Sequence, residues 1–152
     1  MKYAIVFPGQ GSQSLGMLSD LSSNFSIVKD IFSEASDALD LDLWKIVQED
    51  EDALNQTENT QPAMLAAGYA TFKILSNEVD LSPICMAGHS LGEYTALVAA
   101  QSLNYFEAVK LVRKRAELMQ SAVPSGTGAM AAILGLDDEK VIEICAQSKI
   151  SG

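Results

Sequence analysis

The chain has 152 residues, 48% of them hydrophobic and 20% charged, a composition that suits one soluble globular domain with a hydrophobic core. Its formal net charge of −10 argues against nucleic acid and against an anionic membrane as partners. No apolar run is long enough to cross a membrane, and Pro8-Gly9 interrupts the apolar start too early for a signal peptide, so we expect a cytoplasmic protein.

The first predicted element is a strand over residues 3–7, which is continuously apolar and therefore expected to be buried on both faces, as in a parallel sheet. A polar loop with two glycines follows at residues 8–13. Apolar residues at helical spacing predict a helix over about 21–39 and a shorter one over 41–47. Residues 49–58 are predicted to form an acidic connector.

Two longer helices are predicted in the middle of the chain. The first covers about 62–77, with Thr60 as its cap and Pro62 in its first turn. The second covers about 104–122 and begins with Asn104 in a capping-box pattern.

The charged and sulfur-containing side chains suggest few further sites. Cys85 and Cys145 both lie in apolar surroundings, which predicts small buried side chains and neither a disulfide nor a metal site. Four of the ten basic residues gather in one helix, namely Lys110, Arg113, Lys114 and Arg115. This cluster is either a solvated helix face, a docking patch or an anion site.

Residues 124–128, Pro-Ser-Gly-Thr-Gly, form the clearest boundary in the sequence. Beyond them we predict a strand over 129–134 and a helix from Asp137 or Asp138 to about Ser148. Because a strand and a helix do not form a domain by themselves, they either extend the first domain or belong to a second one.

The stretch from Ile84 to Glu93 contains the strongest single motif, the G-x-S-x-G sequence Gly88-His89-Ser90-Leu91-Gly92. A short apolar strand precedes it and a helical run follows it, which is typical of a nucleophile elbow. A Cβ at Gly88 or Gly92 would collide with the neighbouring strand or helix in such a turn. Ser90 is therefore the candidate nucleophile, and the following helix N-terminus favours an anion beside it.

A serine nucleophile needs a general base and donors for the oxyanion. The backbone N–H of Leu91 and the loop Gly9–Gly11 are candidate donors, because the carboxyl ends of parallel strands meet at one edge of a sheet. The sequence has one histidine, His89, which as a neighbour of Ser90 in an extended segment points to the opposite face. We interpret its imidazole as bonded to nearby backbone, and we identify no orienting acid.

Four segments taken together resemble the signatures of malonyl-CoA:acyl-carrier-protein transacylases. They are Phe7-Pro8-Gly9-Gln10-Gly11-Ser12-Gln13, Thr60-Gln61-Pro62-Ala63, Gly88-His89-Ser90-Leu91-Gly92-Glu93, and Arg115 on the next helix. The similarity covers the whole chain, and the set is far more specific than any one motif.

The resemblance implies an α/β fold in which a large, hydrolase-like subdomain with a parallel sheet carries an inserted ferredoxin-like α+β subdomain. Residues 1–123 would form the N-terminal part of the large subdomain, and residues 124–152 a linker with the first βα unit of the small one. The catalytic histidine of the family lies downstream of the insertion, so we expect the chain to be the N-terminal portion of a longer enzyme.

The implied reaction is transfer of a malonyl group from coenzyme A to acyl carrier protein, in fatty acid biosynthesis. By the family pattern Ser90 carries the acyl group, Gln10 and Leu91 supply oxyanion N–H groups, and Arg115 pairs with the malonyl carboxylate. No cofactor is implied, because the coenzyme A thioester is a substrate and the carrier's phosphopantetheine is the acceptor.

Two alternatives stay open. An esterase or thioesterase of the α/β-hydrolase type shares the elbow, although no HGGG-type oxyanion loop is present and Arg115 would have no role. A non-catalytic module that binds acyl-CoA or a carrier protein would explain the missing base.

Overall fold

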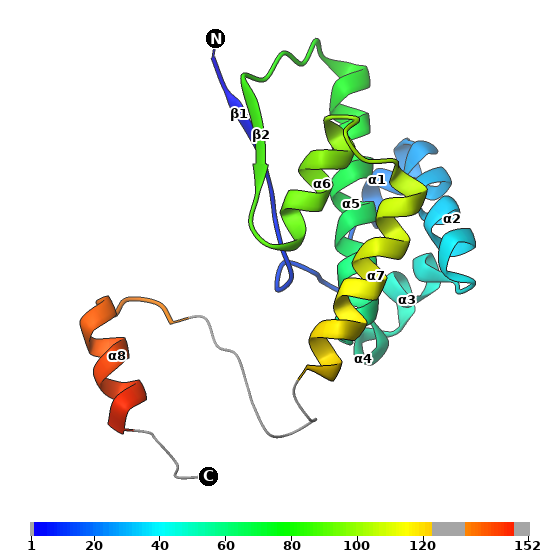
Figure 1. Ribbon diagram of the computed structural model, residues 1–152. Helices are drawn as coiled ribbons and strands as arrows, with labels where there is room; N and C mark the ends of the chain where they lie inside the picture. Colours follow the sequence, from blue (N-terminus) through cyan, green and yellow to red (C-terminus); the bar gives the residue numbers. More distant parts are fainter. Residues whose placement is uncertain (1, 123–132, 148–152) are drawn as a thin grey trace. The chain divides into compact units, whose positions relative to one another are not determined.

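The sheet consists of two parallel strands, β1 (Ala4–Phe7) and β2 (Cys85–Gly88), in a computed structural model that describes residues 2–122 and 133–147. Ala4 pairs with Cys85 and Phe7 with Gly88, so the two strands end at the same edge (Figure 1). The loop after β1 and the turn after β2 therefore lie next to each other.

The prediction that the first strand is buried on both faces is wrong. Helix α6 (Leu91–Ala99) packs against one face of both strands, where Phe7, Ala96 and Ala99 form a small apolar cluster. The other face carries alternate residues of both strands and is open among the described residues, and Val6 on it is 72% exposed. Cys85 faces the same way, which explains why it is exposed where burial was expected.

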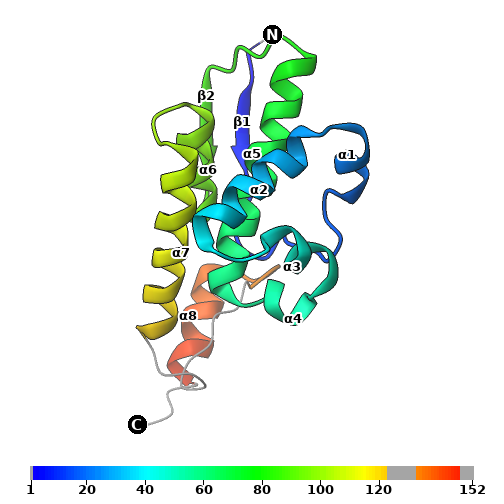
Figure 2. The ribbon, with the colours of Figure 1, turned by 90° about the vertical axis from the view of Figure 1, so that its right-hand side faces the viewer.

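Seven further helices accompany α6 in the described residues. Their bounds are α1 Ser19–Asn24, α2 Ile27–Leu39, α3 Leu43–Glu49, α4 Glu51–Leu54, α5 Thr57–Glu78, α7 Tyr105–Ser121 and α8 Asp138–Gln147. Helix α5 packs against α2, α6 and α7 (Figures 1 and 2). Its small residues, among them the fully buried Ala63, Ala66 and Ala70, allow the close approach of these neighbours.

Two predicted segments are divided differently in the structure. The helix expected over 21–39 is two helices, because Phe25 between them adopts an extended conformation with φ −133° and ψ 106°. The connector expected over 49–58 contains α4 and the start of α5. The Asp50 carboxylate caps α4 by accepting a 2.9 Å hydrogen bond from the Ala53 N–H, the local pairing that favours Asp at such positions.

The start of α5 also differs from the prediction. Thr60 is not its cap but lies fully buried in its first turn, where its hydroxyl donates to the Leu54 and Gln56 carbonyls. Pro62 is the sixth residue of α5, so its missing N–H leaves the Glu58 carbonyl without its helical donor. The guanidinium of Arg113 on α7 donates to that carbonyl at 3.1 Å and thereby ties the two helices together.

The structure forms two compact units, residues 1–122 and 123–152, and the second is described by itself. The predicted linker at 124–128 and residues 129–132 of the predicted strand lie outside the described residues, whereas Ile133 and Leu134 belong to no strand. Helix α8 agrees with the predicted helix. Its Cys145 is exposed, contrary to the expectation of burial.

The turn between β2 and α6 is packed too closely for side chains at its two glycines. A Cβ on Gly88 would meet the backbone of Gly92 and Glu93, and a Cβ on Gly92 would meet the carbonyl group of Phe7 on β1. These are backbone atoms, which cannot swing aside as a side chain can. The predicted collisions at both glycines are thus confirmed, and they fix the start of α6 against the end of β1.

We predict that Gly92→Ala lowers the free energy of unfolding by more than about 3 kcal/mol, because the added methyl overlaps backbone. Gly16→Ala is the control. Gly16 has φ +75° with nothing within 4 Å of a Cβ, so only backbone strain of about 1 kcal/mol is expected. Urea denaturation of the two variants measures both values, and equal small losses would contradict the packing argument.

Candidate active site

Ser90 lies at the tip of the turn between β2 and α6, with an exposed side chain. Its φ of 55° and ψ of −110° are rare for a residue with a Cβ, and such strain persists only where the surrounding structure imposes it. The close packing at Gly88 and Gly92 supplies that constraint. The hydroxyl therefore stands at the N-terminus of α6, where partial positive charge favours a developing anion.

The guanidinium of Arg115, from α7, contacts Ser90 directly. Its Nη2 donates to the Ser90 Oγ at 2.8 Å and its Nη1 donates to the Gln61 Oε1 at 2.7 Å. The Arg115 Cζ also lies 5.6 Å from the ring centroid of Tyr94, within cation–π range. The candidate nucleophile of the turn and a cation from α7 are thus in direct contact.

The other three members of the basic cluster are paired with carboxylates. Lys110 lies 3.8 Å from Glu107, Arg113 lies 3.6 Å from Glu58, and both Arg113 and Lys114 contact Glu117, at 3.4 and 3.1 Å. The hydrogen bond from Lys114, with help from Arg113, lowers the pKa of Glu117. Arg115 is the member of the cluster that makes no salt bridge among the described residues. This favours an anion site at Arg115 over a general docking patch.

Two backbone N–H groups of the turn and of the loop after β1 have no acceptor among the described residues. One belongs to Leu91, the first residue of α6, and the other to Gln10 in the loop after β1. The loop lies against the turn, since a Cβ on Gly9 would come within 3.0 Å of the His89 carbonyl oxygen. The Gln10 side chain is held by a 3.2 Å hydrogen bond to the Thr57 hydroxyl. Both N–H groups are thus available to an anion.

His89 is exposed, and its imidazole makes no hydrogen bond within residues 2–122 and 133–147. The interpretation of an imidazole bonded to nearby backbone is therefore wrong for these residues. Its backbone supports the turn instead, because the His89 carbonyl accepts a 2.9 Å hydrogen bond from the Gly92 N–H. In the described part of the chain, the one side chain that bonds the Ser90 hydroxyl is Arg115.

Sequence reasoning missed two residues of this site, Gln61 and Tyr94. Gln61 belongs to one of the segments that carry the resemblance, but the predicted helix begins after it, and the sequence gives no sign of its burial. Tyr94 follows Ser90 by four residues, so the two lie one turn apart around the start of α6. That spacing was a usable signal, although aromatic residues at helical spacing more often serve only the core.

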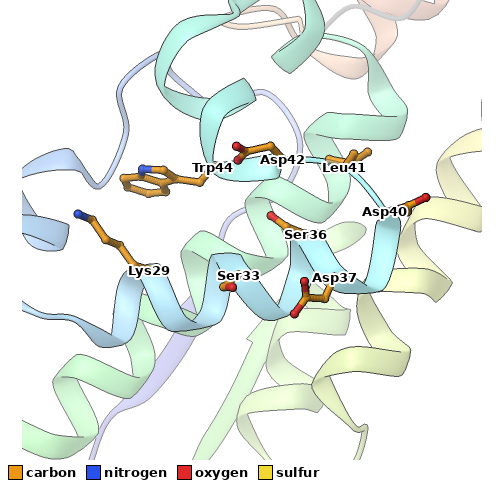
Figure 3. A pocket seen from close by; sticks show the side chains of 8 residues that line it. All are labelled: Lys29, Ser33, Ser36, Asp37, Asp40, Leu41, Asp42 and Trp44. Carbon is orange, nitrogen blue, oxygen red and sulfur yellow. The ribbon is translucent and has the colours of Figure 1, made fainter.

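Two cavities lie in the described residues, and neither is lined by Ser90 or Arg115. One of about 640 Å³ runs along β2 and α6. Figure 3 shows the other, of about 720 Å³, at the junction of α2 and α3. Its lining residues are Lys29, Ser33, Ser36, Asp37, Asp40, Leu41, Asp42 and Trp44. Within the described residues no group of His, Cys, Asp or Glu could hold a metal ion, and no helix there is both long and apolar enough to cross a membrane.

Known proteins resemble the chain in sequence and in structure. It is 53% identical over 150 residues to the malonyl CoA-acyl carrier protein transacylase of Haemophilus influenzae, with 97% of this chain and 48% of that protein covered. The Escherichia coli K12 transacylase is 49% identical over 148 residues, again covering 97% and 48%. The solved transacylase structure from Coxiella burnetii superposes with a TM-score of 0.92 at 49% identity, covering 99% of this chain and 48% of that one.

A second solved structure is a type II polyketide synthase acyl-carrier protein in complex with its malonyl-transacylase. It matches with a TM-score of 0.90 at 50% identity, covering 97% of this chain and 48% of that chain. The chain thus spans about half the length of the relatives it matches. The profile of the family described as "Acyl transferase domain" matches residues 4–151, nearly the whole chain. The chain has an α/β fold that matches solved transacylase structures of about 50% sequence identity. On this evidence it belongs to the acyl transferase domain family.

Proposed function

We propose that this chain forms the acyl-binding half of a malonyl-CoA:acyl-carrier-protein transacylase, which acts in fatty acid biosynthesis. The proposal rests on the 2.8 Å hydrogen bond that Arg115 Nη2 donates to Ser90 Oγ. It puts a permanent positive charge beside the candidate nucleophile, where an acyl group with a free carboxylate needs one. An esterase with water as acceptor would gain nothing from that charge.

In the proposed first step the Ser90 Oγ attacks the thioester carbonyl carbon of malonyl-CoA. The hydroxyl proton passes to a general base that the described residues do not supply, and the negative charge gathers on the carbonyl oxygen. The N–H groups of Leu91 and Gln10, both without acceptors among the described residues, are the proposed oxyanion donors. When the carbon–sulfur bond breaks, the base passes the proton to the sulfur, so that coenzyme A leaves as the thiol and the malonyl group remains as an ester on Ser90.

The second step reverses the first with a different thiol. The phosphopantetheine thiol of acyl carrier protein attacks the ester, takes the malonyl group and returns the proton to Ser90. The carrier partner is supported by the complex between a related transacylase and its carrier protein. No cofactor is needed, since the thioester itself supplies the activated acyl group.

The finer architecture and the location belong to the same proposal. We propose that residues 1–123 are the N-terminal part of a hydrolase-like large subdomain with a parallel sheet. Residues 124–152 would be the linker and first βα unit of a ferredoxin-like subdomain, consistent with the separate second unit. The location proposed from the sequence is the cytoplasm.

Replacement of Ser90 by Ala should abolish malonyl transfer. The test uses a chimera in which this chain replaces the matching half of the Haemophilus influenzae transacylase, to which it is 53% identical. The expected result is a loss of covalent malonyl labelling and of transfer to the carrier protein, because the ester has no oxygen on which to form. Undiminished labelling in the variant would remove Ser90 from the reaction.

In the same chimera, Arg115→Ala should lower malonyl transfer far more than acetyl transfer. A hydrogen bond to a charged partner contributes about 1.5–3 kcal/mol, so the malonyl preference should fall about ten- to a hundredfold. Lys114→Ala is the matched control, since this neighbouring side chain is 66% exposed and paired with Glu117. Equal losses for both acyl groups would mean that Arg115 has a structural role or contacts another part of the substrate.

The 152 residues on their own should not sustain turnover, because no general base bonds Ser90 among the described residues. A multiple-turnover malonyl-transfer assay should give only the residual rate that binding and the oxyanion donors provide. His89→Ala is the control. Turnover that is robust in this chain and disappears in the His89 variant would mean that His89 is the base.

A further inference from the structure

Gln61 is a fully buried polar side chain on α5 that binds Arg115 of α7. Its exposed fraction is 0%, and its Oε1 accepts the 2.7 Å hydrogen bond from Arg115 Nη1. Its Nε2 lies 3.5 Å from the Met119 sulfur, a weak acceptor. Burying an amide without hydrogen-bond partners costs free energy of folding. The hydrogen bond from the Arg115 guanidinium removes part of that cost and holds the Gln61 side chain in place.

The other terminal nitrogen of the same guanidinium, Nη2, faces the Ser90 hydroxyl. Arg115 Nη2 bonds Ser90 Oγ at 2.8 Å, and the ring of Tyr94 lies 5.6 Å from Arg115 Cζ. A guanidinium is planar, so a bond that fixes Nη1 also fixes the direction of Nη2. Gln61 therefore determines whether Nη2 points toward Ser90.

The amide also keeps the positive charge of Arg115 available. A carboxylate at position 61 would form a buried ion pair with Arg115 and so compete with the carboxylate of an incoming acyl group. A neutral acceptor orients the guanidinium without neutralising it. Arg113 shows the contrast, because Glu58 and Glu117 both pair with its charge.

The backbone around Gln61 is fixed as well. Arg113 Nη1 donates to the Glu58 carbonyl at 3.1 Å and to the Asn59 Oδ1 at 2.7 Å, two hydrogen bonds between α7 and the first turn of α5. The first of these carbonyls is the one that Pro62 leaves without a helical donor. Gln61 follows Asn59 by two residues on α5, and Arg115 follows Arg113 by two residues on α7, so these two side chains form the next contact between the helices.

We propose that Gln61 is the positioning residue that sets the preference of this site for a carboxylated acyl group. The inference rests on the proposed function. With Ser90 free, Gln61 holds Nη2 against the hydroxyl. Once Ser90 is esterified its oxygen is a poorer acceptor, and the same fixed orientation presents Nη2 to the malonyl carboxylate.

The test compares two variants of Gln61 in the chimera with the Haemophilus influenzae transacylase. Gln61→Met keeps the length of the side chain and removes the acceptor, and Gln61→Glu keeps the acceptor and adds a charge. Both should lower kcat/KM for malonyl transfer about tenfold relative to acetyl transfer, mainly through KM, because binding of the carboxylate is weakened. Gln56→Met is the matched control, since its exposed side chain makes no hydrogen bond in the described residues. It should leave the ratio unchanged.

A second measurement on the chain itself does not depend on the reaction. In NMR spectra at low temperature, the Nη1 and Nη2 protons of Arg115 should give separate signals while Gln61 blocks rotation about the Cζ–Nε bond. The signals should merge in Gln61→Met. Separate signals in that variant, or equal losses of malonyl and acetyl transfer in folded variants, would overturn the inference. If the unaltered chimera transfers no malonyl, the proposed function fails, and the NMR result alone decides whether Gln61 orients Arg115.

Discussion

The contact between the start of α6 and the end of β1 is the constraint on which the rest of the site depends. Gly92 lies so close to the Phe7 carbonyl that no Cβ fits between them, and Gly88 lies equally close to the backbone of Gly92. This packing forces Ser90 into a backbone conformation with positive φ. It also goes with a close approach of the loop after β1 to the turn after β2, where a Cβ on Gly9 would lie 3.0 Å from the His89 carbonyl oxygen.

Helices α5 and α7 supply the charge that this turn lacks. The proline in α5 frees a backbone carbonyl, which Arg113 binds, and the register that results brings Gln61 to Arg115 and Arg115 to Ser90. The site therefore depends on contacts between residues 25 to 55 positions apart in the sequence as well as on the local turn. A change of register between these two helices would separate Arg115 from Ser90 while leaving the turn between β2 and α6 intact.

Local rules accounted for the turn and its glycines, because steric exclusion at Gly88 and Gly92 follows from a motif that can be read in the sequence. The proposal that Arg115 binds a malonyl carboxylate came from the family resemblance, since local spacing does not say where a side chain on α7 will point. The prediction that Cys85 is buried was wrong, because an apolar strand is buried only on a face that another layer covers. One face of this sheet is open among the described residues. Gln61 was missed for the same kind of reason, as its role arises from a tertiary contact.

We propose that the acyl ester forms on Ser90 and that Arg115 binds the carboxylate of the same acyl group. A crystal structure of the chimera with the Haemophilus influenzae transacylase, after treatment with malonyl-CoA, tests both parts at once. We expect an ester on Ser90 Oγ and a carboxylate oxygen about 2.7–2.9 Å from an Arg115 Nη, with Nη1 still bonded to Gln61. An unmodified Ser90, or an ester whose carboxylate is bound by other residues while Arg115 remains elsewhere, would contradict it.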